Sequence, residues 1–355
     1  MEGSSVYRYV GRWLSLAVLL VASMSLVVAC GGGSSSSSGG SETSGGGGGG
    51  AEYNFRLAEA HPEDHPTAQA DQEFARLLDE KSDGRIQVEV FENAQLGEEA
   101  SAIEQVQTGA IEMTRVSSAP MAEFVDEMGV FSLPYIFDDG EHMWNFLQGE
   151  GGQQLLTDLE SSGFHGLTYY DPGARSFYTA GEPVESMGDL QGLDIRIQQN
   201  DINVAWMEAL GGSPTPMDYG EVYSSLQSGV LDGAENNWPS YQSSGHYEVA
   251  PNFTESEHQR VPELLMISQQ VWDQMSEEDR QIMQEAADES TEFQREEWQK
   301  ASEQAEQEMK DEGVNVINNE DIEDLDEWKE AVQPVIEEYQ GEYGEVLDQI
   351  DQARQ

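Results

Sequence analysis

The strongest pattern in this chain lies in three neighbouring segments: DPGARSFYT at 171–179, GLDIRIQQND at 192–201 and ALGGSPTPMDYGEVYSSLQSGVLDGAENNWPSY at 209–241. Short strand-like runs, helical runs and turns rich in Gly or Pro alternate within them, which predicts α/β units. Arg175 and Arg196 each lie beside strand-like sequence, and a run dense in amide and aromatic side chains follows. Fixed guanidinium donors beside amides and flat apolar faces suit a small polar ligand that carries a carboxylate.

The alternation continues on both sides of these segments and predicts a parallel sheet. A helix predicted at 276–312 is long for a globular domain, so we expect it to be bent or broken, or to run along the back of two domains. The remaining expected strands lie near 53–58, 86–90, 111–116, 166–170, 195–197, 230–234 and 313–317. The remaining expected helices lie near 67–81, 95–108, 143–159 with a break at 149–152, 203–210, 219–227 and from 321 onward.

The composition restricts the possible partners. The 355 residues include 69 Asp plus Glu against 16 Lys plus Arg, a net charge of −53. This charge repels nucleic-acid phosphates and anionic lipid surfaces, so neither is an expected partner. The acids are spread along the chain, which favours adaptation to high salt over an ordinary acidic secreted protein; loss of structure by circular dichroism in dilute salt would test this. An anionic ligand meets the same field, so its binding must rest on short, fixed contacts.

The N-terminus predicts export. Residues 1–30 contain two arginines, an apolar run and a small-residue site before Cys30, which predicts a signal peptide. The site resembles a bacterial lipobox, in which the cysteine is lipidated; a plain signal peptide and a transmembrane helix are the alternatives. Residues 31–50 are almost entirely Gly and Ser and predict a flexible tether. Cys30 is the only cysteine, so the folded part has no disulfide.

No motif for catalysis stands out. The chain lacks the nucleophile elbow, the dinucleotide fingerprint, the Walker loop and the HExxH motif. His61 and His65 are four residues apart, but each precedes a proline, which favours a polar loop near ligand over a metal site. We therefore expect no catalytic residue, metal or cofactor. A secreted enzyme that acts on acidic sugars is the alternative class.

The candidate binding residues also have simpler interpretations. Arg175 and Arg196 could form surface ion pairs in an acidic protein. Arg175, however, follows a Pro-Gly turn that can present it to a cleft, and Arg196 alternates with two isoleucines. The remaining candidates could equally be core or turn residues: Trp238, Tyr241, Asn236 and Asn237.

The mature chain, from 53 to 350, resembles the substrate-binding proteins of tripartite ATP-independent periplasmic (TRAP) transporters, of the DctP type. This resemblance implies an α/β, two-domain, periplasmic-binding-protein-like fold with a cleft, hinge strands and a long helix that spans both domains. It also implies a receptor that hands a small organic acid to a membrane permease driven by an ion gradient. The segments that carry it are FENAQLGEE at 91–99, FSLPYIF at 131–137, GARSFYT at 173–179, GLDIRIQQ at 192–199 and PTPMDYGEVYSSLQSGVLDGAENNWPSY at 214–241.

The resemblance implies domain boundaries. Domain I is expected to comprise 51–172 plus about 261–301, and domain II 173–260 plus about 302–355. Most relatives are free periplasmic proteins, so a lipidated Cys30 departs from the family pattern.

The same resemblance implies roles for site residues. Arg196 would form a bidentate pair with the ligand carboxylate, supported by Arg175 and Asn236. Tyr219 would pack on the ligand. Gln199 and Glu99 would contact hydroxyls or water, and His61 would lie on a pocket wall that differs from the family pattern.

The solute is expected to be a sugar acid. Trp238 and Tyr241 resemble the branch of the family that binds glucuronate or galacturonate, because a flat aromatic suits a pyranose face. Asn237 stands where receptors for C4-dicarboxylates tend to carry proline. A C4-dicarboxylate remains the alternative ligand, and a sensory role remains the alternative to transport.

Overall fold

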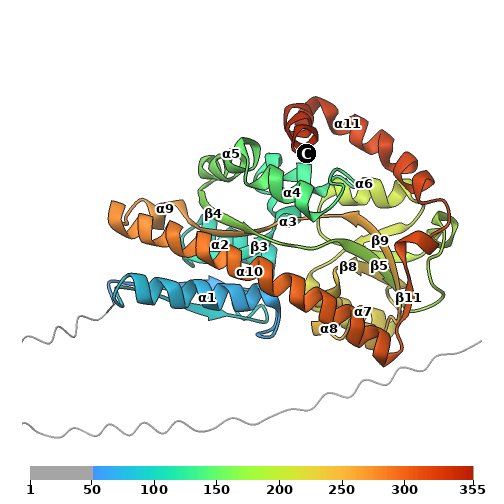
Figure 1. The fold of residues 1–355 in the computed structure, drawn as a ribbon, viewed down its shortest axis with the longest axis horizontal. Coiled ribbons are helices and arrows are strands. Elements are labelled where there is room, and N and C mark those ends of the chain that lie inside the picture. Colours follow the sequence, from blue (N-terminus) through green and yellow to red (C-terminus); the bar gives the residue numbers. More distant parts are fainter. Residues whose placement is uncertain (1–50, 355) are drawn as a thin grey trace, which may run out of the picture. The chain divides into compact units, whose positions relative to one another are not determined.

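The computed structural model describes residues 51–354, so the predicted signal peptide, the tether and Cys30 lie outside the described residues. Two sheets organise these residues (Figure 1). The first sheet has the order β2-β1-β3-β10-β4, formed by Ile86–Phe91, Tyr53–Ala58, Met113–Ser117, Glu263–Ser268 and Phe164–Tyr170. The second sheet has the order β11-β9-β5-β8-β6-β7, formed by Asn315–Ile317, Asn252–Gln259, Arg175–Thr179, Gly233–Asn236, Asp194–Ile197 and Ser213–Pro216.

Both sheets are mixed, so the prediction of a parallel sheet was wrong. In the first sheet β1 is parallel to β2 and β3, but β10 is antiparallel to β3 and β4. In the second, β5 is antiparallel to both β8 and β9. The chain passes between the sheets three times: from β4 to β5, from β9 to β10, and from β10 through the long helix α10 to β11. The first two crossings run directly from strand to strand. The antiparallel strands are the ones that carry the chain across.

Helices cover the sheets, and most of their bounds lie close to the predicted ones. The break predicted at 149–152 is shorter, because the second helix of that segment begins at Glu150 and includes Gly151 and Gly152. The strand predicted at 230–234 begins later, at Gly233, because Gly229 ends α7 in the left-handed region (φ 72°) and Val230 is exposed. The α-helices are α1 Pro66–Lys81, α2 Glu99–Gln107, α3 Ser118–Met121, α4 Gly140–Leu147, α5 Glu150–Asp158, α6 Asp201–Ala209, α7 Val222–Ser228, α8 Trp238–Ser243, α9 Gln269–Trp272, α10 Glu277–Glu312 and α11 Leu325–Gln352.

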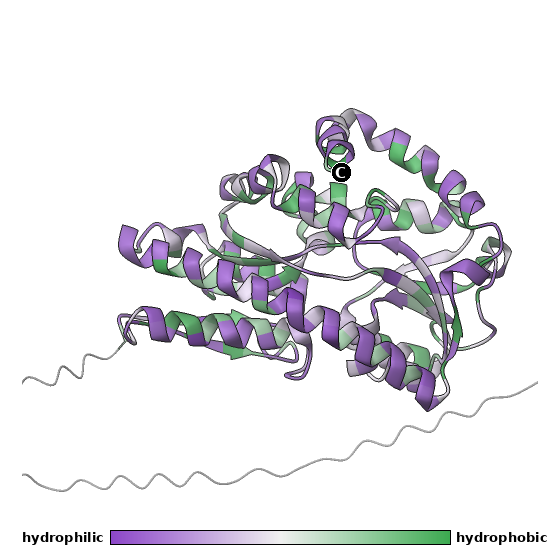
Figure 2. Ribbon diagram, in the orientation of Figure 1, coloured by the Kyte–Doolittle hydropathy of each residue, from purple (hydrophilic) through white to green (hydrophobic). Residues whose placement is uncertain are grey.

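The long helix α10 is a single helix of 36 residues that runs along both halves (Figure 1). Ser276 caps its start by accepting from the Asp279 N–H, and Gly313 ends it at φ 93°. Met283 packs in the core of the first sheet, while Met309 packs with side chains of the second. The side of α10 visible in Figure 2 is largely hydrophilic, as expected of a helix with one buried stripe.

The C-terminal helix α11 packs against α4, α5 and α6, so it contacts elements that precede and follow the first crossing between the sheets. Its assignment to domain II alone, like the other predicted domain boundaries, stays a prediction. No helix within residues 51–354 has both the length and the apolar character to cross a membrane.

Candidate binding site

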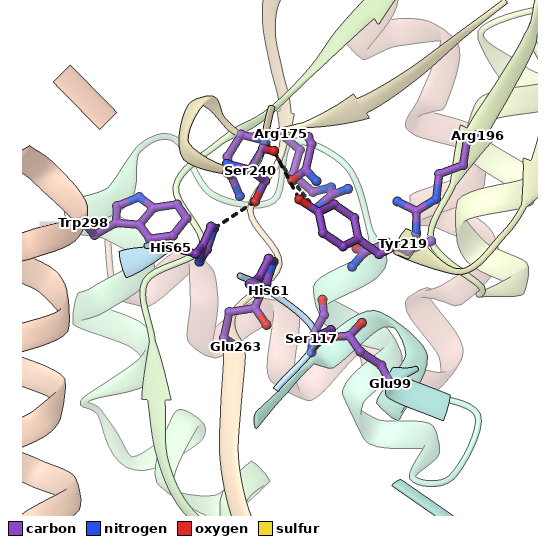
Figure 3. A pocket seen from close by; sticks show the side chains of 14 residues that line it. His61, His65, Glu99, Ser117, Arg175, Arg196, Tyr219, Ser240, Glu263 and Trp298 are labelled. Atoms are coloured by element: carbon purple, nitrogen blue, oxygen red, sulfur yellow. Dashed lines mark hydrogen bonds between the residues drawn. The ribbon is translucent and has the colours of Figure 1, made fainter. Parts of the chain in front are cut away.

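A pocket lies between side chains contributed by both sheets and by α10 (Figure 3). Most of the side chains that line it are polar or charged, whereas ligand pockets are usually lined mainly by apolar side chains. The residues that line it are Ala60, His61, His65, Glu99, Ser117, Arg175, Arg196, Gln198, Tyr219, Asn236, Asn237, Ser240, Glu263 and Trp298.

Arg196 is a buried cation without a counter-ion. It lies in β6, is 5% exposed, and donates from Nε and Nη2 to the Met217 carbonyl oxygen at 2.9 and 2.7 Å. Within residues 51–354 no carboxylate forms an ion pair with it. Burial lowers the pKa of the guanidinium, an effect that Glu235 opposes and Arg175 reinforces. A buried guanidinium in this state has donor capacity left for an anion.

Arg175 is buried to the same degree but is already paired. Its guanidinium is hydrogen-bonded to both carboxylate oxygens of Glu235, one of them at 2.9 Å from Nη2, and Nη2 also donates to the Glu235 carbonyl at 2.8 Å. Burial alone would lower the pKa of Arg175, but the Glu235 charge outweighs it and the pKa is raised. Only Nη1, which donates to Asn236 Oδ1 at 3.1 Å, extends beyond this pair.

Asn236 and Asn237 both line the pocket, but their side-chain amides make different hydrogen bonds. Asn236 Oδ1 accepts from Arg175 and from the Asn237 N–H. Asn237 is the N-cap of α8: its Oδ1 accepts from the Ser240 N–H at 2.8 Å, and its Nδ2 donates to the Pro172 carbonyl at 3.0 Å. Asn237 therefore uses its amide to tie α8 to the crossing from β4 to β5. It also lines the pocket, and its contact to a ligand stays a prediction.

Tyr219 and Glu99 line the pocket, whereas Gln199 does not. The Tyr219 hydroxyl donates to the Ser240 carbonyl at 3.1 Å, and its ring meets the His61 ring edge-on at 5.2 Å between centroids. Glu99 is the first residue of α2. Gln199 lines a neighbouring, narrower cavity that shares Glu99, Tyr219 and Arg196 with the main pocket.

Trp238 and Tyr241 lie away from the pocket. Trp238 stacks on Phe253 with ring centroids 3.7 Å apart, and the buried Tyr241 donates to the Ala250 carbonyl at 2.7 Å. The cause is helical periodicity: residues 238 and 241 share one face of α8, which packs on β9, while Ser240 faces the pocket. We therefore leave both aromatics out of the proposed ligand contacts.

The flat apolar side chain in the pocket comes instead from Trp298, in the middle of α10. Its ring meets His65 edge-on at 5.6 Å. Gly173 makes room for it, because a Cβ at this position would lie 2.8 Å from Trp298 Nε1, and its φ of 61° also favours glycine. The Gly before Arg175 was visible in the sequence, but nothing local indicated that it faces a residue so far along the chain.

His61 and His65 stack with ring centroids 3.8 Å apart and form one wall. The Thr67 N–H donates to His65 Nδ1 at 3.2 Å, so His65 Nε2 carries the proton and donates to Ser240 Oγ at 3.1 Å. Burial, and then His61, lower the pKa of His65 well below its usual value, so it is neutral. From sequence we expect both histidines in a loop near the ligand but count only His61 among the site residues; the structure places His65 in the pocket lining as well.

Behind the pocket, the fully buried Arg115 holds three carboxylates: Glu59, Glu99 and Glu263. Burial alone would lower the pKa of Arg115 and raise that of Glu59, but their mutual attraction outweighs burial, so the pKa of Arg115 is raised and that of Glu59 is lowered. Burial, and also Glu99, raise the pKa of Glu263 against the effect of Arg115. This cluster could not be predicted from sequence, because its members come from α2, β3, β10 and the residue that follows β1.

Two buried polar atoms in the pocket lack partners. Ser117 Oγ and Gln198 Oε1 make no hydrogen bond within the described residues. Buried polar atoms are rarely left unpaired, so both favour a ligand that supplies donors and acceptors. No group of His, Cys, Asp and Glu in residues 51–354 is placed to hold a metal ion. Taken together, one unpaired cation and several free polar groups between two sheets define a binding protein for a small polar anion.

The chain belongs to the bacterial extracellular solute-binding proteins, family 7 (DctP), whose family model matches residues 57–342. A solute-binding protein of Chromohalobacter salexigens is 38% identical over 81% of this chain and 84% of that protein. The TRAP periplasmic solute-binding protein of Xanthobacter autotrophicus Py2, solved with bound β-D-galacturonate, is 39% identical with a TM-score of 0.80, covering 84% of this chain and 98% of that one. A further TRAP protein of Chromohalobacter salexigens, solved with D-glucuronate, is 36% identical with a TM-score of 0.80, covering 84% and 99%. These findings confirm the predicted family and the two-domain α/β fold.

Proposed function

We propose that this protein is the extracytoplasmic receptor of a TRAP transporter and binds a hexuronate such as glucuronate or galacturonate. The observation that carries the proposal is Arg196, a buried guanidinium with no carboxylate partner in the described chain. In a protein of net charge −53, such a group is a specific place for one ligand carboxylate.

The rest of the pocket supports a sugar acid. Ser117 Oγ and Gln198 Oε1 are unpaired and can bond hydroxyls, and the Trp298 indole offers a flat apolar surface for a sugar ring. The similar TRAP proteins solved with galacturonate and glucuronate support the same class of ligand. The pocket's role is binding rather than catalysis, and the partner that receives the solute is a membrane permease.

Cys30 lies outside the described residues, so lipid anchoring is a proposal from sequence alone. We infer that the mature chain begins at a lipidated Cys30 and is held at the outer face of the membrane. Incorporation of labelled palmitate that Cys30→Ser abolishes would support the anchor, and equal labelling of both forms would refute it.

The decisive test of the function is Arg196→Ala, measured by isothermal titration calorimetry with D-glucuronate and D-galacturonate. Removal of the main carboxylate partner should cost about 2–5 kcal/mol of binding free energy. The matched control is Arg76→Ala, which removes the same charge from an exposed ion-paired site on α1 and should leave affinity unchanged.

Two results would overturn the proposal. One is an Arg196→Ala protein that stays folded and binds within about threefold of the wild-type affinity, a difference of less than about 0.7 kcal/mol. The other is a wild-type protein that binds neither hexuronate. A wild-type protein that bound C4-dicarboxylates instead would keep the receptor class and refute the sugar-acid ligand.

A further inference from the structure

The two sides of the pocket carry opposite charge. In Figure 3, Arg175 and Arg196 lie on the side formed by the second sheet, while Glu99, Ser117 and Glu263 lie across the pocket on the side formed by the first sheet and α2. A ligand that reaches across the pocket therefore meets a guanidinium at one end and carboxylates at the other.

Each of these two carboxylates has one oxygen engaged by the protein. Glu99 Oε1 accepts from Arg115 Nη1 at 2.9 Å and from the Ser117 N–H at 3.0 Å, and Glu263 Oε2 accepts from the same Arg115 nitrogen at 2.7 Å. No hydrogen bond within residues 51–354 engages Glu99 Oε2 or Glu263 Oε1. Both residues line the pocket, so these oxygens are available to accept from ligand hydroxyls.

The charges around Arg115 do not balance. Glu59 alone occupies Arg115 through both of its oxygens, one at 2.7 Å from Nε and the other hydrogen-bonded to Nη2. Glu99 and Glu263 share the remaining nitrogen, and no second Lys or Arg pairs with either of them in the described chain. On this side of the pocket three carboxylates and His61 surround one guanidinium, so a ligand carboxylate placed against Glu99 and Glu263 would meet like charge at short range.

We propose that Glu263, together with Glu99, sets the specificity of the site by accepting hydroxyl hydrogen bonds and excluding a second ligand carboxylate. This inference rests on the proposed function, because it requires Arg196 to hold the first carboxylate. It assigns the ligand class more narrowly: a monocarboxylate whose far end carries hydroxyls. An aldarate, in which that far end is oxidised to a carboxylate, is excluded by the same two residues.

The test uses three six-carbon acids and titration calorimetry on the whole protein. D-galacturonate represents the proposed ligand, and D-galactonate and galactarate are open-chain acids that carry one and two carboxylates. We expect the wild-type protein to prefer each monocarboxylate over galactarate by about 100-fold or more. Glu263→Gln should weaken galacturonate binding by about tenfold, because a charged acceptor becomes neutral, and should shrink the preference over galactarate by at least about tenfold.

Two further variants separate specificity from general effects. Glu104→Gln removes the same charge from an exposed site on α2, outside the pocket, and should change none of the three affinities. Glu263→Asp keeps the charge but withdraws the oxygens, so it should lose galacturonate affinity while still excluding galactarate. It also serves as the specificity variant if the glutamine form does not fold.

The inference is overturned if the wild-type protein binds galactarate as tightly as galacturonate, or if Glu263→Gln changes all three affinities by the same factor. It is also overturned if Glu263→Asp admits galactarate. Failure of the proposed function has a different signature, in which the wild-type protein binds none of the three acids, and that result would remove both proposals.

Discussion

Arg115 and Arg196 are both buried arginines beside the same pocket, but their surroundings are opposite. Arg115 contacts three carboxylates behind the pocket, and its pKa is raised because their attraction outweighs burial. Arg196 contacts a main-chain carbonyl inside the pocket, and burial lowers its pKa. The chain has 69 acidic residues, yet none of those within 51–354 forms an ion pair with Arg196, and this makes the unpaired guanidinium the informative feature.

The comparison separates structural from functional arginines. A paired arginine contributes to folding, since loss of one partner leaves the others buried and uncompensated. An unpaired buried arginine lowers the stability of the free protein and is compensated when an anion binds. Arg175, held by Glu235, belongs with Arg115 by this criterion, although it lines the pocket.

The largest expected effect is on stability. Arg115→Met should lower the free energy of unfolding by about 3–5 kcal/mol, because it leaves buried carboxylates without a cation. The matched control is Arg196→Met, which removes an unpaired charge and should leave the unfolding free energy unchanged or raise it. Urea titration of the ligand-free protein, followed by circular dichroism, measures both.

The comparison would break if the two variants lost similar stability, because Arg196 would then be a structural residue. It would also break if Arg115→Met were as stable as wild type while Arg196→Met unfolded. Either result would mean that the hydrogen bonds from Arg196 to the Met217 carbonyl oxygen stabilise the fold.

Several residues of the site could be predicted because they lie close together along the chain. Arg175, Arg196, Tyr219 and Asn236 all fall between residues 171 and 241, and all line the pocket. Their contacts to a ligand stay a prediction. The aromatic next to them misled the interpretation, because the face of α8 on which Trp238 lies could not be known before the position of β9 was known.

The remaining parts depend on contacts between distant segments. The Arg115 cluster joins residues 59, 99, 115 and 263, and each of them separately looks like an ordinary charged residue of an acidic protein. Trp298 enters the pocket from a helix whose sequence is dominated by charged and amide residues. The strands at 252–268 received no prediction, yet they carry the second crossing between the sheets. The high-salt adaptation stays a prediction from composition.

The smallest predicted effect concerns the pKa of His246, which depends on the charge of Arg196. The Tyr178 hydroxyl and His246 Nδ1 are hydrogen-bonded at 2.7 Å inside the core of the second sheet. Burial, and then Arg196, lower the pKa of His246 to about 3 from 6.5. Because the folded pKa lies below the unfolded one, the contribution of this group to stability is complete above pH 6.5 and is lost progressively as the pH falls toward 3.

Within that range His246→Gln should reduce the pH dependence of the unfolding free energy by about 1.4 kcal/mol per pH unit. Urea titrations of both proteins between pH 6.5 and 4.5 measure this difference, and subtraction removes the contributions of the other buried histidines and acids. In Arg196→Met, NMR titration should show a higher pKa for His246, because one of its two causes is gone. An unchanged pKa in that variant would mean that the Arg196 charge is already neutralised in the free protein, and the contrast with Arg115 would then fail.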